Sequence, residues 1–304
     1  MIKRLGAIAI TNPHNIPLIW RTITMNYIDF NSEEYLDNNR LTFGVAQILN
    51  PIAGSNNIGM CVPLSSSADT KFDSKEWRQV QHTFSTAEMP EPIYLSTSPK
   101  LVVINLTPSY LKHKSDGTII PFDSVLYNQE KQKQENKLKI VSYAWVYFIS
   151  DDNLSTLNPE PFLLTLSGAA GVNFRMAWLT PKDSKQNGKR TGFIADVEAL
   201  YSKLVRKSDK PPAAMNSKFH SHCIFHPSFD AERRGVKGAS ASVTVVKDYV
   251  KPTKLEDCLI PPGSDLSSII EQGRQSVENW KPKALMSSNP STEPKAYLVD
   301  DMPF

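Results

Sequence analysis

The chain has 304 residues, 40% of them hydrophobic, and a formal net charge of +3. This length and apolar content suit one large globular domain or two ordinary ones. No apolar run approaches the roughly 18 residues that span a bilayer, which argues against a transmembrane protein, and we expect no membrane partner. The apolar stretch from Leu5 to Ile10 is shorter than a signal-peptide core of about 7 to 15 residues, so we expect a cytoplasmic protein. The odd number of cysteines, at Cys61, Cys223 and Cys258, argues against a disulfide framework.

Charge is divided unevenly along the chain. Residues 1–99 contain 7 Lys or Arg and 9 Asp or Glu, residues 100–254 contain 23 and 14, and residues 255–304 contain 4 and 8. The net charges are therefore −2, +9 and −4. A basic middle and an acidic end indicate a body that meets a polyanion and a tail that meets something else, with ordinary scatter of surface charge as the alternative.

Short apolar runs fill residues 1–92, and Pro, Asn and Gly interrupt them. Such frequent turn signals favour strands and loops over helices. The exception begins at Asn31, where "NSEEYLDNN" predicts one short capped helical turn.

Strand signals sharpen from Ile93 onward. "PKLVVINLTPSYL" is β-branched and apolar, and Asp116-Gly117 follows between two extended runs, as in a hairpin turn. Residues 128–139, "NQEKQKQENKLK", are polar throughout and predict a solvated loop or an exposed helix. "LKIVSYAWVYFIS" alternates with period two and is the clearest strand of the chain.

Three strands and two helices are predicted between residue 161 and residue 254. "PFLLTLSG" predicts a strand, while "AAGVNFRMAWL" and the amphipathic "FIADVEALYSKLVRK" predict helices. A basic loop, "TPKDSKQNGKRTG", lies between the two helices. "KFHSHCIFH" and "ASASVTVVKDYV" alternate and predict two further strands.

Composition changes after Lys251. "LIPPGSDLSSIIEQGRQSVENW" predicts a linker and a short helix capped by Asp265, and the Pro- and Ser-rich end predicts a flexible tail. We expect a strand-rich nucleic-acid-binding body over 1–254, with candidate subdomains 1–92 and 93–254, then a linker and helix over 255–281 and a tail over 282–304. The predicted fold class is α+β, mainly antiparallel β, with an OB-like or related barrel body, a few helices and a disordered C-terminal tail.

The last five residues are Asp300, Asp301, Met302, Pro303 and Phe304. This end resembles the C-terminal tip of bacterial single-stranded DNA-binding proteins, which has acids, an apolar residue, Pro and Phe. The resemblance covers the tip and the linker before it, and it implies docking onto replication, recombination and repair enzymes. Chemistry agrees, because a terminal Phe offers a ring to an apolar pocket and a carboxylate to its basic rim. A frayed end without a role is the alternative.

Aromatic and basic side chains of the body are candidates for contacting single-stranded DNA. Tyr and Trp rings stack on unpaired bases while Lys and Arg contact phosphates, although a Tyr-Trp-Tyr stripe equally suits a second buried face. The candidates on the predicted 139–149 strand are Lys139, Tyr143, Trp145 and Tyr147. Those elsewhere are Lys182, Lys185, Lys189, Arg190, His220, His222, Arg233 and Arg234.

Metal and enzyme signatures are weak. On a strand, His220 and His222 would face one way and Cys223 the other, so "HSHCIFH" does not predict a metal site. The chain has no P-loop, no G-x-S-x-G, no H-E-x-x-H and no Gly-rich dinucleotide loop, so we expect neither a cofactor nor catalysis.

These patterns together predict a protein that binds and protects single-stranded DNA and recruits DNA-processing enzymes through its tip. A homo-oligomeric body, or one that coats a strand, would multiply the avidity of such a tip. One alternative is an interaction protein that docks on the replication machinery by its tip without binding DNA. A second is a metal-dependent nuclease that uses the His-rich segment.

Overall fold

The computed structural model describes residues 43–51, 57–65, 71–84, 89–133, 137–179, 191–205, 215–234 and 241–282. All of them belong to one unit of the chain, which begins at Phe43. The predicted turn at Asn31, the basic residues 182–190 and the tip at 300–304 lie outside the described ranges.

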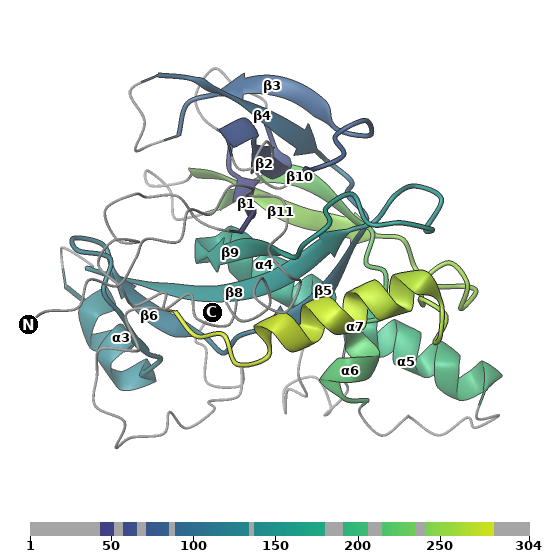
Figure 1. Cartoon of the computed structure of the whole chain (residues 1–304). Coiled ribbons are helices and arrows are strands. Elements are labelled where there is room, and N and C mark those ends of the chain that lie inside the picture. Colours follow the sequence, from purple (N-terminus) through teal and green to yellow (C-terminus); the bar gives the residue numbers. More distant parts are fainter. Residues whose placement is uncertain are drawn as a thin grey trace, which may run out of the picture. The chain divides into compact units, whose positions relative to one another are not determined.

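A nine-stranded sheet organises this unit around β8 (Leu138–Phe148) (Figure 1). One edge of β8 pairs with β9 (Phe162–Ser167), and the other pairs with β6 (Tyr110–His113) and β5 (Leu101–Leu106). The remaining strands are β1 (Val45–Leu49), β2 (Gly59–Pro63), β3 (Arg78–His82), β4 (Glu91–Ser96) and β7 (Ile119–Pro121). Among the described pairs, β1 and β9 are parallel and the others antiparallel.

The sheet is open in the part of the chain that the structure describes. Its order is β3-β4-β2-β1-β9-β8-β6-β7, with β5 beside β8, and β3 and β7 at the two ends. The predicted α+β, mainly antiparallel fold is confirmed, whereas the described strands do not close into a barrel. Strands from both sides of residue 92 lie in this sheet, so the two candidate subdomains share it.

A two-stranded sheet and five described helices complete the unit. The small sheet pairs β10 (Pro227–Arg234) with β11 (Ala241–Tyr249). The helices are α3 (Ser124–Lys131), α4 (Gly168–Trp178), α5 (Phe193–Leu204), α6 (Ser217–His220) and α7 (Asp265–Val277). The predicted helices within 169–179 and 193–207 are therefore confirmed as α4 and α5.

The strand predicted for "KFHSHCIFH" is wrong at its start, where the chain forms α6. The Asn216 side chain accepts a hydrogen bond from the Phe219 amide at 3.0 Å and so caps this helical turn. The Cys223 amide then donates to the His220 carbonyl at 3.1 Å. Local capping and turn bonds thus override the period-two pattern of this segment.

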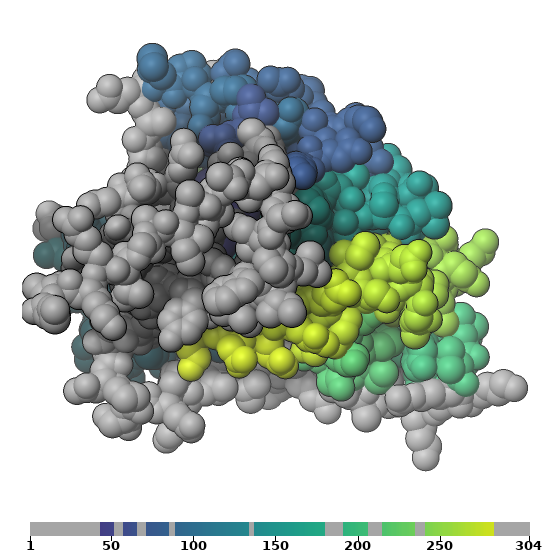
Figure 2. Space-filling model, viewed as in Figure 1, coloured from purple at the N-terminus to yellow at the C-terminus, as the bar shows by residue number. Residues whose placement is uncertain are grey.

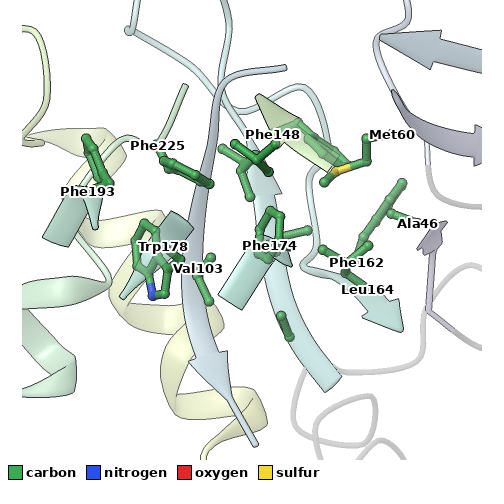
Figure 3. Packing of buried hydrophobic residues seen from close by; sticks show 14 of the residues in the cluster. Ala46, Met60, Val103, Phe148, Phe162, Leu164, Phe174, Trp178, Phe193 and Phe225 are labelled. Carbon is green, nitrogen blue, oxygen red and sulfur yellow. The ribbon is translucent and has the colours of Figure 1, made fainter. Parts of the chain in front are cut away.

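Both faces of β8 are buried, each by a different layer. Ala144, Val146 and Phe148 face a core that includes Phe174 of α4 and Phe193 of α5, part of which Figure 3 shows. The opposite face belongs to a second cluster that α7 completes with the following side chains: Leu266, Ile270 and Val277. Because layers cover both sides, every β8 residue from Val141 to Phe148 is buried.

Residues 255–281 form part of the body. Cys258 and Ile260 are buried in the two cores, and α7 begins after Ser264, whose hydroxyl accepts from the Ser267 amide at 3.1 Å. The N-cap is therefore one residue before the predicted Asp265. Figure 2 shows the outer face of α7 at the surface, beside the green atoms that precede it in the chain.

Candidate nucleic-acid interface

Three lysines lie close together where β6 ends and β8 begins. Lys112 of β6 lies directly opposite Lys139 of β8 in the antiparallel register. The Lys114 amide donates to the Lys137 carbonyl at 2.8 Å, which extends this pairing by two residues. Because strand side chains alternate, Lys112, Lys114 and Lys139 share one face of the sheet, and we call them the lysine cluster.

Mutual repulsion is built into the lysine cluster. The pKa of Lys139 is held below its usual value, first by partial burial and then by the charges of Lys112 and Lys114. Among the described residues, neither Lys112 nor Lys139 forms an ion pair. Like charges directly opposite each other on a sheet are destabilising, and a bound polyanion would relieve that cost.

The predicted turn at Asp116-Gly117 holds the cluster in place. The Asp116 carboxylate accepts from the Thr118 amide at 2.9 Å, which lowers the pKa of Asp116. Gly117 has φ 77°, a left-handed conformation that glycine adopts without strain. The predicted hairpin is confirmed, since this turn joins β6 to β7 and sets Lys112 opposite Ile119.

The predicted stacking residues are buried. Tyr143, Trp145 and Tyr147 are only 7%, 3% and 2% exposed. Trp280 packs edge-on against Tyr143 and Trp145, with ring centroids 5.4 Å apart in both pairs, and Gly273 of α7 lies against Tyr147. The stacking role expected for these three rings is therefore corrected, because α7 and the turn after it cover their face.

Trp280 remains partly exposed beside this aromatic group, as does Phe43, whose ring packs edge-on against Trp145. Trp280 lies just beyond the C-terminal end of α7 and is followed by the exposed Lys281. Tyr110, which pairs with Val141, lies between this aromatic group and the lysine cluster on the same face. A nucleic-acid strand bound along this face would contact the lysine cluster at one end and the partly exposed indole of Trp280 at the other.

The other predicted contacts that the structure describes do not join the lysine cluster. Arg233 and Arg234 are exposed at the end of β10, in the small two-stranded sheet, and Arg234 pairs with Glu232 at 3.0 Å. His220 and His222 lie in and after α6, on the turn that packs beside β5 and α7. Lys182, Lys185, Lys189 and Arg190 lie outside the described residues.

Each polar side chain of the His-rich segment has its own partner. His220 Nε2 bonds Glu198 at 2.8 Å, and His222 Nε2 bonds the Ser267 hydroxyl at 3.0 Å. His226 Nε2 bonds the Ser98 hydroxyl at 3.0 Å. No three His, Cys, Asp or Glu residues of the described ranges are grouped to hold a metal.

Lys112, Lys114 and Trp280 were not among the contacts predicted from the sequence. The signal was present as "KHK" and "KLK", two K-x-K segments on runs that the predicted hairpin could bring together. Trp280 had no comparable signal, because its contact with Tyr143 joins residues 137 positions apart.

The sequence profile of a domain of unknown function, DUF5895, matches residues 42–291. The chain belongs to this family. The matched region contains the lysine cluster, Trp280 and every described element, while the tip lies beyond it. No curated protein and no solved structure matches the chain. No described helix of this DUF5895 member has both the length and the apolar character needed to cross a membrane.

Proposed function

We propose that this protein binds single-stranded DNA along the lysine cluster and recruits DNA-processing enzymes through its terminal Asp300–Phe304. The observation that supports this most is the direct cross-strand pairing of Lys112 with Lys139. Two unneutralised charges on neighbouring strands have little structural value, whereas they match a chain of phosphates.

A single strand suits the surroundings of the cluster better than a duplex. Trp280 is partly exposed on the face of the sheet that carries the lysines, and base stacking on an aromatic ring contributes about 1–3 kcal/mol per base. Bases paired inside a duplex cannot reach such a ring. The basic net charge of residues 100–254 adds a favourable field around the site.

Recruitment is the part of the proposal that concerns the tail. The resemblance of the tip to that of bacterial single-stranded DNA-binding proteins supports it, as does the acidic charge of residues 255–304. A relation of the body to OB-folds and a cytoplasmic location stay predictions. The proposal needs neither catalysis nor a cofactor.

Fluorescence anisotropy with a labelled oligo-dT strand tests the DNA-binding part. The test variant is Lys112→Gln/Lys139→Gln. The matched control is Lys75→Gln/Lys203→Gln, which removes the same charge from exposed positions outside the cluster. We expect the test variant to bind at least about ten-fold more weakly than the parent protein at moderate salt. The slope of log K plotted against log salt concentration should become shallower by about 0.7 for each phosphate contact that is lost.

The control must bind within about two-fold of the parent protein, because a uniform loss of charge would otherwise explain the result. Equal affinities for the test and control variants, or no binding by the parent protein at micromolar concentration, would refute the proposal. Thermal melting of each variant confirms that the fold is retained.

A further inference from the structure

A cavity lies between β5, the C-terminal end of α4, α6 and α7. Its volume is about 340 Å³, within the roughly 300–1,000 Å³ of small-ligand sites. The lining residues are Val103, Ile104, Asn105, Leu106, Trp178, Leu179, Ser217, His220, Arg274 and Glu278. The cavity shares none of these residues with the lysine cluster.

An irregular strand forms one wall. The register of β5 against β8 shifts between Val103 and Asn105, so Ile104 occupies a β-bulge. Bulges change the direction of side chains and are frequent beside functional sites. Apart from the bridge between Leu101 and Phe225, no described strand pairs with the outer edge of β5. This unpaired edge borders the cavity.

Trp178 forms a rigid aromatic wall. Its ring stacks on Phe193 with centroids 5.7 Å apart and meets Phe225 edge-on at 5.4 Å. Figure 3 shows the indole nitrogen on the side of the ring away from Phe193 and Phe225. This N–H donates to no described residue, and it is not among the buried polar atoms left without a partner, so it can donate to water or to a molecule in the cavity.

His220 adds an oriented imidazole. Its Nε2 donates to the Oε1 of Glu198 at 2.8 Å, and that buried carboxylate is itself held by the Met215 amide at 3.0 Å. When the imidazole carries one N–H, donation through Nε2 leaves Nδ1 as an acceptor. Nδ1 has no protein partner among the described residues.

The charges around the cavity are compensated. Arg274 donates to Glu271 through Nε at 3.0 Å and to Glu278 through Nη1 at 3.2 Å. Asn105 donates to the Val277 carbonyl at 2.8 Å, so its side-chain oxygen can still accept. The site thus presents an aromatic and apolar wall, a donor and two acceptors, with little net charge.

We propose that this cavity binds one nucleobase. A base has a flat apolar face for the indole and leucine walls and an edge that both donates and accepts. A phosphate fits poorly, because the guanidinium of Arg274 is already shared between two carboxylates. The base can come from a free nucleoside or from an unstacked position of a bound strand, and only the second source rests on the function proposed above.

Calorimetric titration with the four deoxynucleosides tests the site, with deoxyribose 5-phosphate as a probe that lacks a base. Ser217→Trp and Leu106→Phe place an extra ring at the cavity wall. Gln272→Trp is the matched control, because it adds a ring at an exposed position of α7 that does not line the cavity. We expect at least one nucleoside to bind the parent protein and the control, and to bind both filled variants about ten-fold or more weakly. Deoxyribose 5-phosphate should give no binding. No heat with any nucleoside, or unchanged affinity in both filled variants despite normal melting, would overturn the assignment.

An oligo-dT strand and an abasic strand of equal length identify the source of the base. If the strand supplies it, the filled variants lose affinity for oligo-dT and keep their affinity for the abasic strand. If the filled variants lose affinity for nucleosides but not for oligo-dT, the ligand of the cavity is a free nucleoside. Failure of the proposed function is seen separately, as loss of binding to both strands in the parent protein.

Discussion

Lys112 and Lys139 lie directly opposite each other on β6 and β8 and place two positive charges side by side on one face of the sheet. Lys114 adds a third charge close enough to help lower the pKa of Lys139. A protein selected for stability alone has no use for such a pair, and this conflict between stability and binding gives a direct prediction.

Lys139→Gln should stabilise the protein while it weakens DNA binding. Loss of a like-charge cross-strand pair is worth about 0.2–1 kcal/mol, and the gain should shrink as salt screens the charges. Urea unfolding at low and high salt measures it. Lys75→Gln, a change at an exposed lysine paired with Asp73, should leave both quantities nearly unchanged. A destabilised Lys139→Gln would contradict the repulsion described here.

Trp280→Ala should weaken DNA binding and lower stability by about 2 kcal/mol, because two edge-on ring contacts and their buried area are lost. The indole N–H of Trp145 is buried and has no hydrogen-bond partner among the described residues, and water would then reach it. We therefore also expect a red shift of tryptophan emission. Trp280→Phe should keep most of the stability, and a Trp280→Ala variant with unchanged DNA affinity would remove this ring from the interface.

Gly273→Ala should destabilise the protein although alanine favours helices. A Cβ at this position would lie 2.5 Å from the ring of Tyr147, which is buried between α7 and the sheet. Overpacking costs about 1–3 kcal/mol and exceeds a helix-propensity gain of about 1 kcal/mol. Thermal melting measures the difference. Gln272→Ala, on the exposed side of α7, is the control, and Tyr147→Leu should rescue Gly273→Ala.

Alkaline unfolding should depend on Tyr147. Burial, with a smaller effect of the Glu160 charge, raises the pKa of Tyr147 from 10 to about 12. Between these values the unfolded chain loses the phenol proton and the folded chain keeps it. The stability present below pH 10 is therefore lost as pH rises toward 12. Tyr147→Phe should show a shallower loss of stability in this window, and parallel curves for the two proteins would contradict the assignment.

Deletion of Asp300–Phe304 should separate the two proposed activities. The truncated protein should keep its affinity for oligo-dT, or bind slightly better because a competing anion is removed. It should lose capture of DNA-processing enzymes in a pull-down. A Phe304→Ala variant, which keeps both aspartates, should lose capture as well, because the ring enters the partner's pocket. Capture that survives both changes would assign recruitment to another part of the chain.

Local patterns predicted much of the fold. Period-two alternation located β8, the helical spacing located α4 and α5, and Asp116-Gly117 located the β6–β7 turn. These succeed because each depends on residues close in the chain. The strand predicted for the His-rich segment was wrong at its start, because the helix-cap and turn hydrogen bonds that form there leave no periodic pattern in the sequence.

The sequence by itself determined that Lys139, Tyr143, Trp145 and Tyr147 share a face, because strand side chains alternate. Only the tertiary structure decided that α7 buries the three rings and leaves the lysine exposed. Alternation tells which residues lie together but not what covers them, and here the cover comes from a helix more than a hundred residues away in the chain.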